Sequence, residues 1–106
     1  MGTRLVDVAK FSSLPAKRGM RVVVEGESLV LWKVGGGVVA AENLCPHQHL
    51  DTLHLGPVEH GEVTCPMHGW SFDLDTGMAI TGSGRLKLYP VRVEKDRVLV
   101  ELHDGS

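Results

Sequence analysis

The fold is decided by the stretch CPMHGWSFD at residues 65–73, which is preceded by CPH at residues 45–47. The later stretch contains a Cys-x2-His element and the earlier one a Cys-x-His element, with a proline after each cysteine. Because proline fixes the backbone angle φ, it stiffens each loop. Either element alone occurs by chance in many proteins, but together they supply two thiolates and two imidazoles from two similar loops. This donor set suits a binuclear iron centre in which both cysteines bind one iron and both histidines the other.

Length and charge narrow the classes of protein to which the chain can belong. Its 106 residues suffice for one domain with a modest core, but not for a further domain that holds an organic cofactor. The net charge is −2, with no basic patch that would indicate nucleic-acid binding. No apolar run approaches the ~20 residues of a membrane span. We therefore expect a cytoplasmic protein without nucleic-acid or membrane partners, in a compartment where paired cysteines bind metals more often than they form disulfides.

Alternating and β-branched segments predict a β-rich base that flanks the two cysteine loops. Only residues 10–18 could hold a helical turn, and Pro15 limits it. Residues 43–86 differ from the rest, because they hold both cysteines and five of the six histidines. We expect a single domain with a base from 1–42 and 87–106 and a cofactor-carrying insert at 43–86. The predicted strands are 4–8, 20–25, 28–34, 38–42, 91–94 and 97–101.

Residues 65–73, followed by Thr76-Gly77 and later by LYPV at 88–91, resemble the Rieske [2Fe–2S] family. The resemblance covers nearly the whole chain. It implies an all-β Rieske fold of three stacked antiparallel sheets, with a cluster-binding subdomain inserted in a β base. It also implies one Rieske-type [2Fe–2S] cluster, in which one iron is bound by two thiolates and the other by the Nδ1 atoms of two histidines. The ligands carried over in this way are Cys45, Cys65, His47 and His68.

The chain resembles the ferredoxin branch of this family, the ferredoxin components of ring-hydroxylating dioxygenase systems. Both cysteines are ligands, so none remains for the disulfide that joins the two loops in the respiratory and photosynthetic branch. The resemblance implies a one-electron carrier, not an enzyme, with a flavin-dependent ferredoxin reductase and a terminal oxygenase as partners. We expect the docking rim and the surroundings of the cluster to comprise Gln48, His49, Leu50, Gly69, Trp70, Gly82, Ser83 and Gly84.

Other interpretations of the two cysteine loops remain open at this point. A zinc site in a structural or interaction module would use the same ligand types, although classical zinc fingers place both cysteines before both histidines. A disulfide between Cys45 and Cys65 is the simplest alternative. The small subunits of assimilatory nitrite reductases resemble this fold and size, so the chain could belong to such an enzyme.

Two departures from the family pattern bear on the properties of the cluster. High-potential relatives carry hydroxyl side chains where this chain has Trp70 and Phe72, so we expect a reduction potential near the lower end of the Rieske range. Residues 82–84 lack the proline that relatives carry there, so this segment could be less rigid than in those relatives.

Asp51, His54 and His60 are similar in type to the mononuclear iron ligands of Rieske-type oxygenases, but that site occupies a separate, larger domain in those enzymes.

Overall fold

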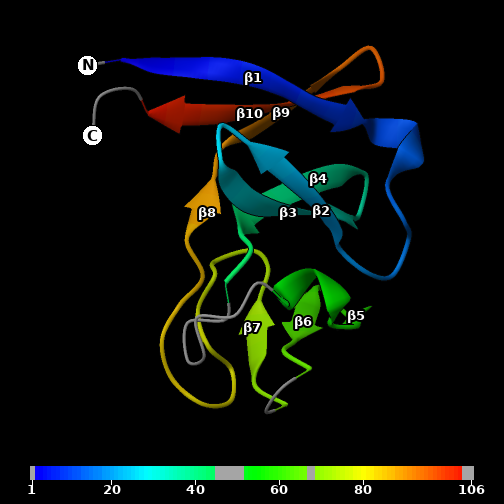
Figure 1. Cartoon of the computed structure of the whole chain (residues 1–106). Helices are drawn as coiled ribbons and strands as arrows, with labels where there is room; N and C mark the ends of the chain where they lie inside the picture. Colours follow the sequence, from blue (N-terminus) through cyan, green and yellow to red (C-terminus); the bar gives the residue numbers. More distant parts are fainter. Residues whose placement is uncertain (1, 45–51, 67–68, 104–106) are drawn as a thin grey trace.

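The computed structural model describes residues 2–44, 52–66 and 69–103, which fold into three antiparallel sheets with almost no helix. The first sheet has the order β1-β10-β9, the second β2-β3-β4-β8 and the third β5-β6-β7 (Figure 1). Two short 3-10 helices, η1 (Phe11–Ser13) and η2 (Leu53–Leu55), complete the described elements. The strands are β1 (Thr3–Lys10), β2 (Met20–Val24), β3 (Glu27–Val34), β4 (Gly37–Glu42), β5 (Val58–Glu59), β6 (Glu62–Thr64), β7 (Ser71–Asp73), β8 (Leu88–Tyr89), β9 (Val91–Glu94) and β10 (Arg97–His103). The expected all-β fold of three antiparallel sheets is confirmed.

The hairpins form where the sequence supplies residues for tight turns. The two-residue turns at 25–26, 60–61 and 95–96 have positive φ at both positions, between 48° and 82°. Such turns match the right-handed twist of the flanking strands, and they favour Gly, Asn and Asp. The predicted hairpins at 28–42 and 91–101 are confirmed with small shifts at their ends. Within 10–18, the only helical segment is η1.

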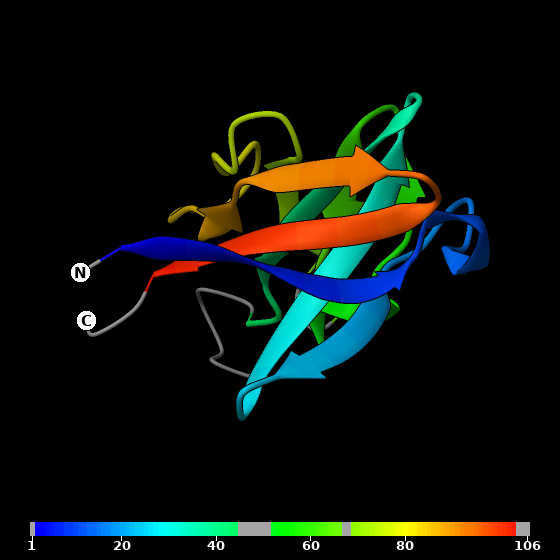
Figure 2. The same ribbon diagram turned by 90° about the horizontal axis from the view of Figure 1, so that it is seen from above.

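Strand β3 lies between two hydrophobic cores, one on each face of the second sheet. Leu29 and Leu31 belong to the core shared with the β1-β10-β9 sheet, whereas Val30 and Trp32 belong to the core shared with the β5-β6-β7 sheet. All four side chains are at most 1% exposed. Seen from above, the strands of the first sheet cross those of the second (Figure 2). A strand covered on both faces has no polar face, which explains its continuous apolar sequence.

The third sheet forms the end of the molecule that carries Cys65. An antiparallel bridge joins Phe72 of β7 to Ala79, and a second bridge joins Met78 to Arg85. The chain then returns to the second sheet, where β8 pairs with β4 (Figure 1). This end of the fold therefore brings the loop at 79–85 beside Trp70, and Leu53 of η2 shares its core with Cys65. Within the described ranges, no helix is long and apolar enough to cross a membrane.

Candidate metal centre

The second ligand loop, residues 65–70, is the turn of the hairpin between β6 and β7. The Cys65 N–H donates to the Trp70 carbonyl (2.7 Å), and the Gly69 N–H donates to the Cys65 carbonyl (2.9 Å). Gly69 has a φ of +71°, a left-handed conformation that glycine adopts without steric cost. The glycine after His68 is thus required by the turn. These two backbone hydrogen bonds join the start of the loop to its end, so the position of Cys65 is set by the pairing of β6 with β7.

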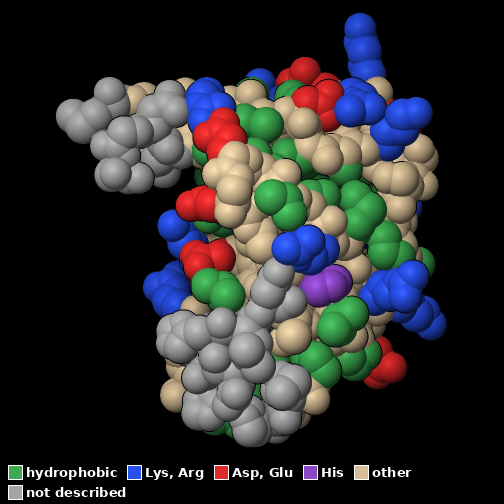
Figure 3. All heavy atoms as spheres, viewed as in Figure 1, with side chains coloured by type: hydrophobic (Ala, Val, Ile, Leu, Met, Phe, Trp, Pro, Cys, Tyr) green, Lys and Arg blue, Asp and Glu red, His purple; other side chains and the backbone are tan. Residues whose placement is uncertain are grey.

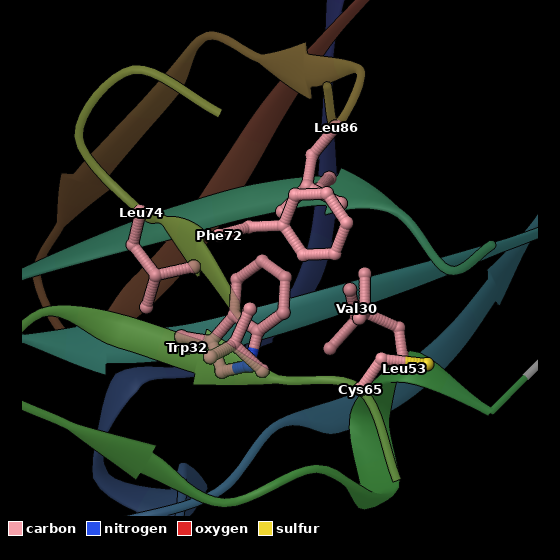
Figure 4. Packing of buried hydrophobic residues seen from close by; sticks show 9 residues of the cluster. Val30, Trp32, Leu53, Cys65, Phe72, Leu74 and Leu86 are labelled. Atoms are coloured by element: carbon pink, nitrogen blue, oxygen red, sulfur yellow. The ribbon is translucent and has the colours of Figure 1, made fainter. Parts of the chain in front are cut away.

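The Cys65 side chain is fully buried at the start of this loop. It belongs to the hydrophobic core that includes Val30, Leu53 and Phe72. Figure 4 shows its sulfur beside Leu53, the first residue of η2. A thiolate in such a place needs a positive partner, because burial of an isolated charge is costly. A metal ion supplies that charge, so the burial of Cys65 fits a metal ligand as well as it fits an apolar thiol.

A third loop, residues 79–85, packs against the second ligand loop through Trp70 and Gly82. A Cβ atom at Gly82 would lie 2.1 Å from Trp70 Cδ2 and 2.4 Å from Trp70 Cε3, so the indole ring occupies the space of a side chain at this position. Gly82 and Gly84 have φ values of +85° and +94°. Proline could adopt neither, because its ring holds φ near −65°.

Hydrogen bonds hold this third loop to β7. The Ser71 N–H donates to Thr81 Oγ1 (2.9 Å), and the Ile80 N–H donates to the Ser71 carbonyl (2.8 Å). The Ala79 N–H donates to the Gly84 carbonyl (3.2 Å), which closes the tip of the loop. These bonds and the Trp70 contact provide the order that a proline would otherwise supply. The loop is therefore tethered to β7 and Trp70 although it contains no proline.

The first ligand loop, residues 44–53, is described at its two ends. Asn43 precedes it and His54 follows it, and the two residues are joined by two hydrogen bonds of 2.9 Å. Asn43 is not among the site residues expected from the sequence. A polar residue directly after an apolar strand and two residues before a predicted ligand cysteine is the signal that could have identified it.

The expected site residues divide into two groups. The structure places Cys65, Gly69, Trp70 and Gly82 in adjoining loops, with Ser83 and Gly84 exposed at the tip of the third loop. The described residues contain no set of three or more His, Cys, Asp or Glu that could hold a metal, and three of the four expected ligands lie outside the described ranges. The expected residues outside the described ranges are Cys45, His47, Gln48, His49, Leu50 and His68.

The remaining histidines have separate surroundings. His54 is half-buried and bonded to Asn43, whereas His60 lies exposed in the turn between β5 and β6. Asp51 lies outside the described ranges. Nothing in the described part of the chain joins His54 and His60 into an oxygenase-type iron site. Trp32 is 1% exposed, as expected of a core residue.

The resolved pKa shifts lie in the β base, away from these loops. Hydrogen bonds from the Arg97 guanidinium (2.8 Å each) lower the pKa of the Asp7 carboxyl. Burial raises the pKa of Tyr89, partly offset by Lys87. The Asp7–Arg97 pair joins β1 to β10. We give neither this pair nor Tyr89 a part in the chemistry of the site.

The donor chemistry of the two ligand loops fits a Rieske-type cluster. The loops contain two cysteines and two histidines in interleaved order. The described thiol is buried, and backbone hydrogen bonds join Cys65 to Gly69 and Trp70. Thiolates suit iron–sulfur centres, and replacement of two of them by imidazoles is the mark of Rieske centres.

Comparison with known proteins agrees with this donor set. A family model described as Rieske [2Fe–2S] domain matches residues 4–90. The ferredoxin component of the naphthalene 1,2-dioxygenase system of Pseudomonas aeruginosa is 34% identical over 104 residues, which cover 96% of this chain and 99% of that protein. The structure of a ferredoxin from Sphingomonas yanoikuyae B1 matches 94% of this chain and 100% of its own at 28% identity, with a TM-score of 0.85.

Other solved structures extend the comparison. A chain in the complex of reduced oxygenase and oxidized ferredoxin in carbazole 1,9a-dioxygenase is 27% identical, with a TM-score of 0.82 and 91% of each chain covered. Two structures attributed to nitrite reductase small subunits match at 24% and 22% identity, a level that shows the fold alone.

The chain belongs to the Rieske [2Fe–2S] domain family. Its cofactor is a Rieske-type [2Fe–2S] cluster. Within the family it is an electron-transfer protein of the ferredoxin type, not a catalytic enzyme.

Proposed function

We propose that this chain carries single electrons from a flavin-dependent reductase to the terminal oxygenase of a ring-hydroxylating dioxygenase system. The observation that carries the proposal is the match over almost the full length of the chain to a ferredoxin component of such a system. The structure of an oxygenase–ferredoxin complex, one chain of which has the same fold, supports an oxygenase as the acceptor. The use of both cysteines as metal ligands suits the cytoplasm.

We assign Cys45 and Cys65 to one iron and His47 and His68 to the other. The bound cluster supplies the chemistry, which is the uptake and release of one electron. The chain holds the cluster, excludes water from the cysteine side and presents the histidine side to a partner. The burial of Cys65 in the core supports the first two roles. Trp70, the last residue of the second ligand loop, packs its indole ring on Gly82 and so joins this loop to the third loop.

The side chains after the second ligand loop favour a low reduction potential. Hydroxyl groups that donate to the sulfurs raise the potential of such centres. Phe72 has no hydroxyl and is fully buried in the core, and Trp70 has none either. We therefore propose a potential near the lower limit of the Rieske range, about −150 mV. A reductive titration that gives a value well above zero would contradict this reasoning.

The distribution of charge indicates the kind of partner surface that fits. Residues 43–86 carry a net charge of −4, whereas the rest of the chain carries +2. Figure 3 shows Lys and Arg side chains over the upper and middle parts of this face, while the described atoms in its lowest part include none. On the third sheet, Glu59, Glu62 and Asp73 are direct cross-strand neighbours. Because this end of the molecule is negatively charged, electrostatic attraction steers it towards a positively charged docking surface on the partner.

Two measurements test the proposed function. The purified protein should contain two irons and two acid-labile sulfides per chain, and a colourless preparation with one zinc would instead identify a zinc module. The reduced protein, mixed anaerobically with the oxygenase component of the naphthalene 1,2-dioxygenase system, should then lose its electron to that oxygenase within seconds. Failure of this transfer, together with tight binding to a sirohaem-containing large subunit, would favour the nitrite reductase alternative.

A further inference from the structure

The side chain of Asn43 is fully buried directly after β4. Its exposed fraction is 0%, and it is the one buried polar or charged side chain in the ranges that the structure describes. A buried amide is costly unless its oxygen and nitrogen find hydrogen-bonding partners. The partners of Asn43 therefore show which contacts outweigh the cost of burying it.

The Asn43 amide joins β3 to the residue that follows the first ligand loop. Its Oδ1 accepts from the His54 backbone N–H (2.9 Å), and its Nδ2 lies 2.9 Å from His54 Nδ1. Nδ2 also donates to Ser28 Oγ (3.2 Å), and the Asn43 backbone N–H donates to the Ser28 carbonyl (3.0 Å). One residue thus holds two segments that are distant in sequence.

The orientation of this amide follows from its partners. The His54 backbone N–H can only donate, so the amide atom that faces it is the oxygen. Nδ2 is then the donor towards His54 Nδ1. The neutral His54 ring consequently carries its proton on Nε2. Leucine or alanine at position 43 would keep the backbone bond to Ser28 but could replace none of the amide contacts, so both would remove the bonds to His54.

Asn43 and His54 bracket the first ligand loop, residues 44–53. The end of the loop is fixed as well: Leu53 is fully buried, and a Cβ atom at Gly19 would lie 3.1 Å from His54 Cα. Because the Asn43 amide ties the residue before the loop to the residue after it, both ends have one fixed separation. A chain segment with fixed ends has fewer conformations than one with free ends.

We propose that Asn43 is a positioning residue for the [2Fe–2S] cluster, which it serves by clamping the two ends of the first ligand loop through His54. The inference rests on the proposed assignment of Cys45 and His47 as ligands. Asn43 itself touches no iron in this scheme. Its contribution is to reduce the freedom of the loop, so that both ligands of this loop stay in place when one of them dissociates transiently.

The test compares N43A, H54A and the double variant N43A/H54A as purified holoproteins. The first measurement is the rate at which the oxidised cluster loses iron to an excess of chelator. The visible absorbance of the cluster is used to monitor this loss. We expect N43A to release iron at least about 10-fold faster, the effect usual for residues that orient metal ligands. H54A keeps the backbone N–H contact and loses the ring contact, so we expect a smaller rise of about 2–10-fold. The double variant should release iron no faster than N43A, because both changes remove the same clamp.

The second measurement is the electron paramagnetic resonance spectrum of the reduced cluster. A loop with free ends should broaden the spectrum of N43A, whereas a purely structural loss of stability should not. The matched control is V98A, in which a fully buried side chain of the other core is shortened. V98A should lower the melting temperature while it leaves both the iron-release rate and the spectrum unchanged.

The outcomes separate this inference from the proposed function. If the unmodified protein contains no cluster, the ligand assignment and the clamp both fail. If it contains the cluster and N43A releases iron within twofold of its rate, the clamp alone is refuted. The clamp would also be refuted if V98A released iron as fast as N43A. The same holds if the increases in iron-release rate of N43A and H54A multiplied in the double variant. Should N43A fail to fold, the rate and spectrum of H54A decide the question.

Discussion

The contact between Gly82 and Trp70 allows a sharp prediction, because a single added methyl group meets the indole ring. In G82A, the new Cβ would lie 2.1, 2.4 and 2.6 Å from three atoms of the Trp70 ring. Ordinary contacts need about 3.4 Å or more, so the ring must move by about 1 Å or the loop must open. Forced overpacking of this kind costs about 1–3 kcal/mol. The positive φ of Gly82 adds about 1–2 kcal/mol for alanine.

Gly26 provides the matched control for the backbone cost. Its φ of +82° is close to the +85° of Gly82, but a Cβ atom there would have no neighbour within 4 Å. We therefore expect G26A to lower the free energy of unfolding by about 1–2 kcal/mol. G82A should lower it by about 2–5 kcal/mol. The difference between the two variants measures the steric contact with Trp70 alone.

The assay is urea denaturation of the holoproteins, with circular dichroism as the measure of unfolding. In a W70A background the ring is absent, so the cost of G82A should fall to that of G26A. Equal costs for G82A and G26A in the parent chain would refute the reasoning. A cost of G82A that does not change in the W70A background would refute it as well.

Three further predictions concern charge. In the row formed by Glu59, Glu62 and Asp73, the middle carboxylate has a like charge directly on each side. E62T should therefore raise the free energy of unfolding by about 0.3–1 kcal/mol at low salt, and a gain that persists undiminished in 1 M salt would contradict this cause. The lowered pKa of Asp7 means that its pairing with Arg97 stabilises the fold above the pKa of the unfolded state. That stability should be lost as the pH falls through the lowered pKa, and D7N should lose less stability over this acid range in pH-dependent melting experiments. Finally, electron transfer to the oxygenase should slow as ionic strength rises, in stopped-flow measurements; a rate independent of salt would argue against electrostatic steering.

Local chemistry and periodicity were enough to predict much of this protein. The interleaved Cys-x-His and Cys-x2-His elements indicated the donor set, since few other sites need two thiolates and two imidazoles in that order. The alternation of residues 91–101 predicted a hairpin, because side chains of a strand point to opposite faces in turn. Trp32 could be placed in the core because it lies in an apolar strand.

Contacts between distant segments could not be read from the sequence. The alternation of β3 side chains between two cores is invisible in an apolar run, because both faces of the strand are covered. The fit of the Trp70 ring against Gly82 depends on the pairing of residues 78–80 with β7, which brings the third loop beside the second ligand loop.

The sequence by itself therefore predicted which side chains bind the cluster, and it determined that the fold is built of strands. The tertiary structure decided how the loops that carry those atoms are held. Ligand identity is a property of single side chains, and strand periodicity is a property of neighbouring ones. The Asn43–His54 bonds and the Trp70–Gly82 contact arise only when the sheets are assembled, because each joins residues that no local pattern connects.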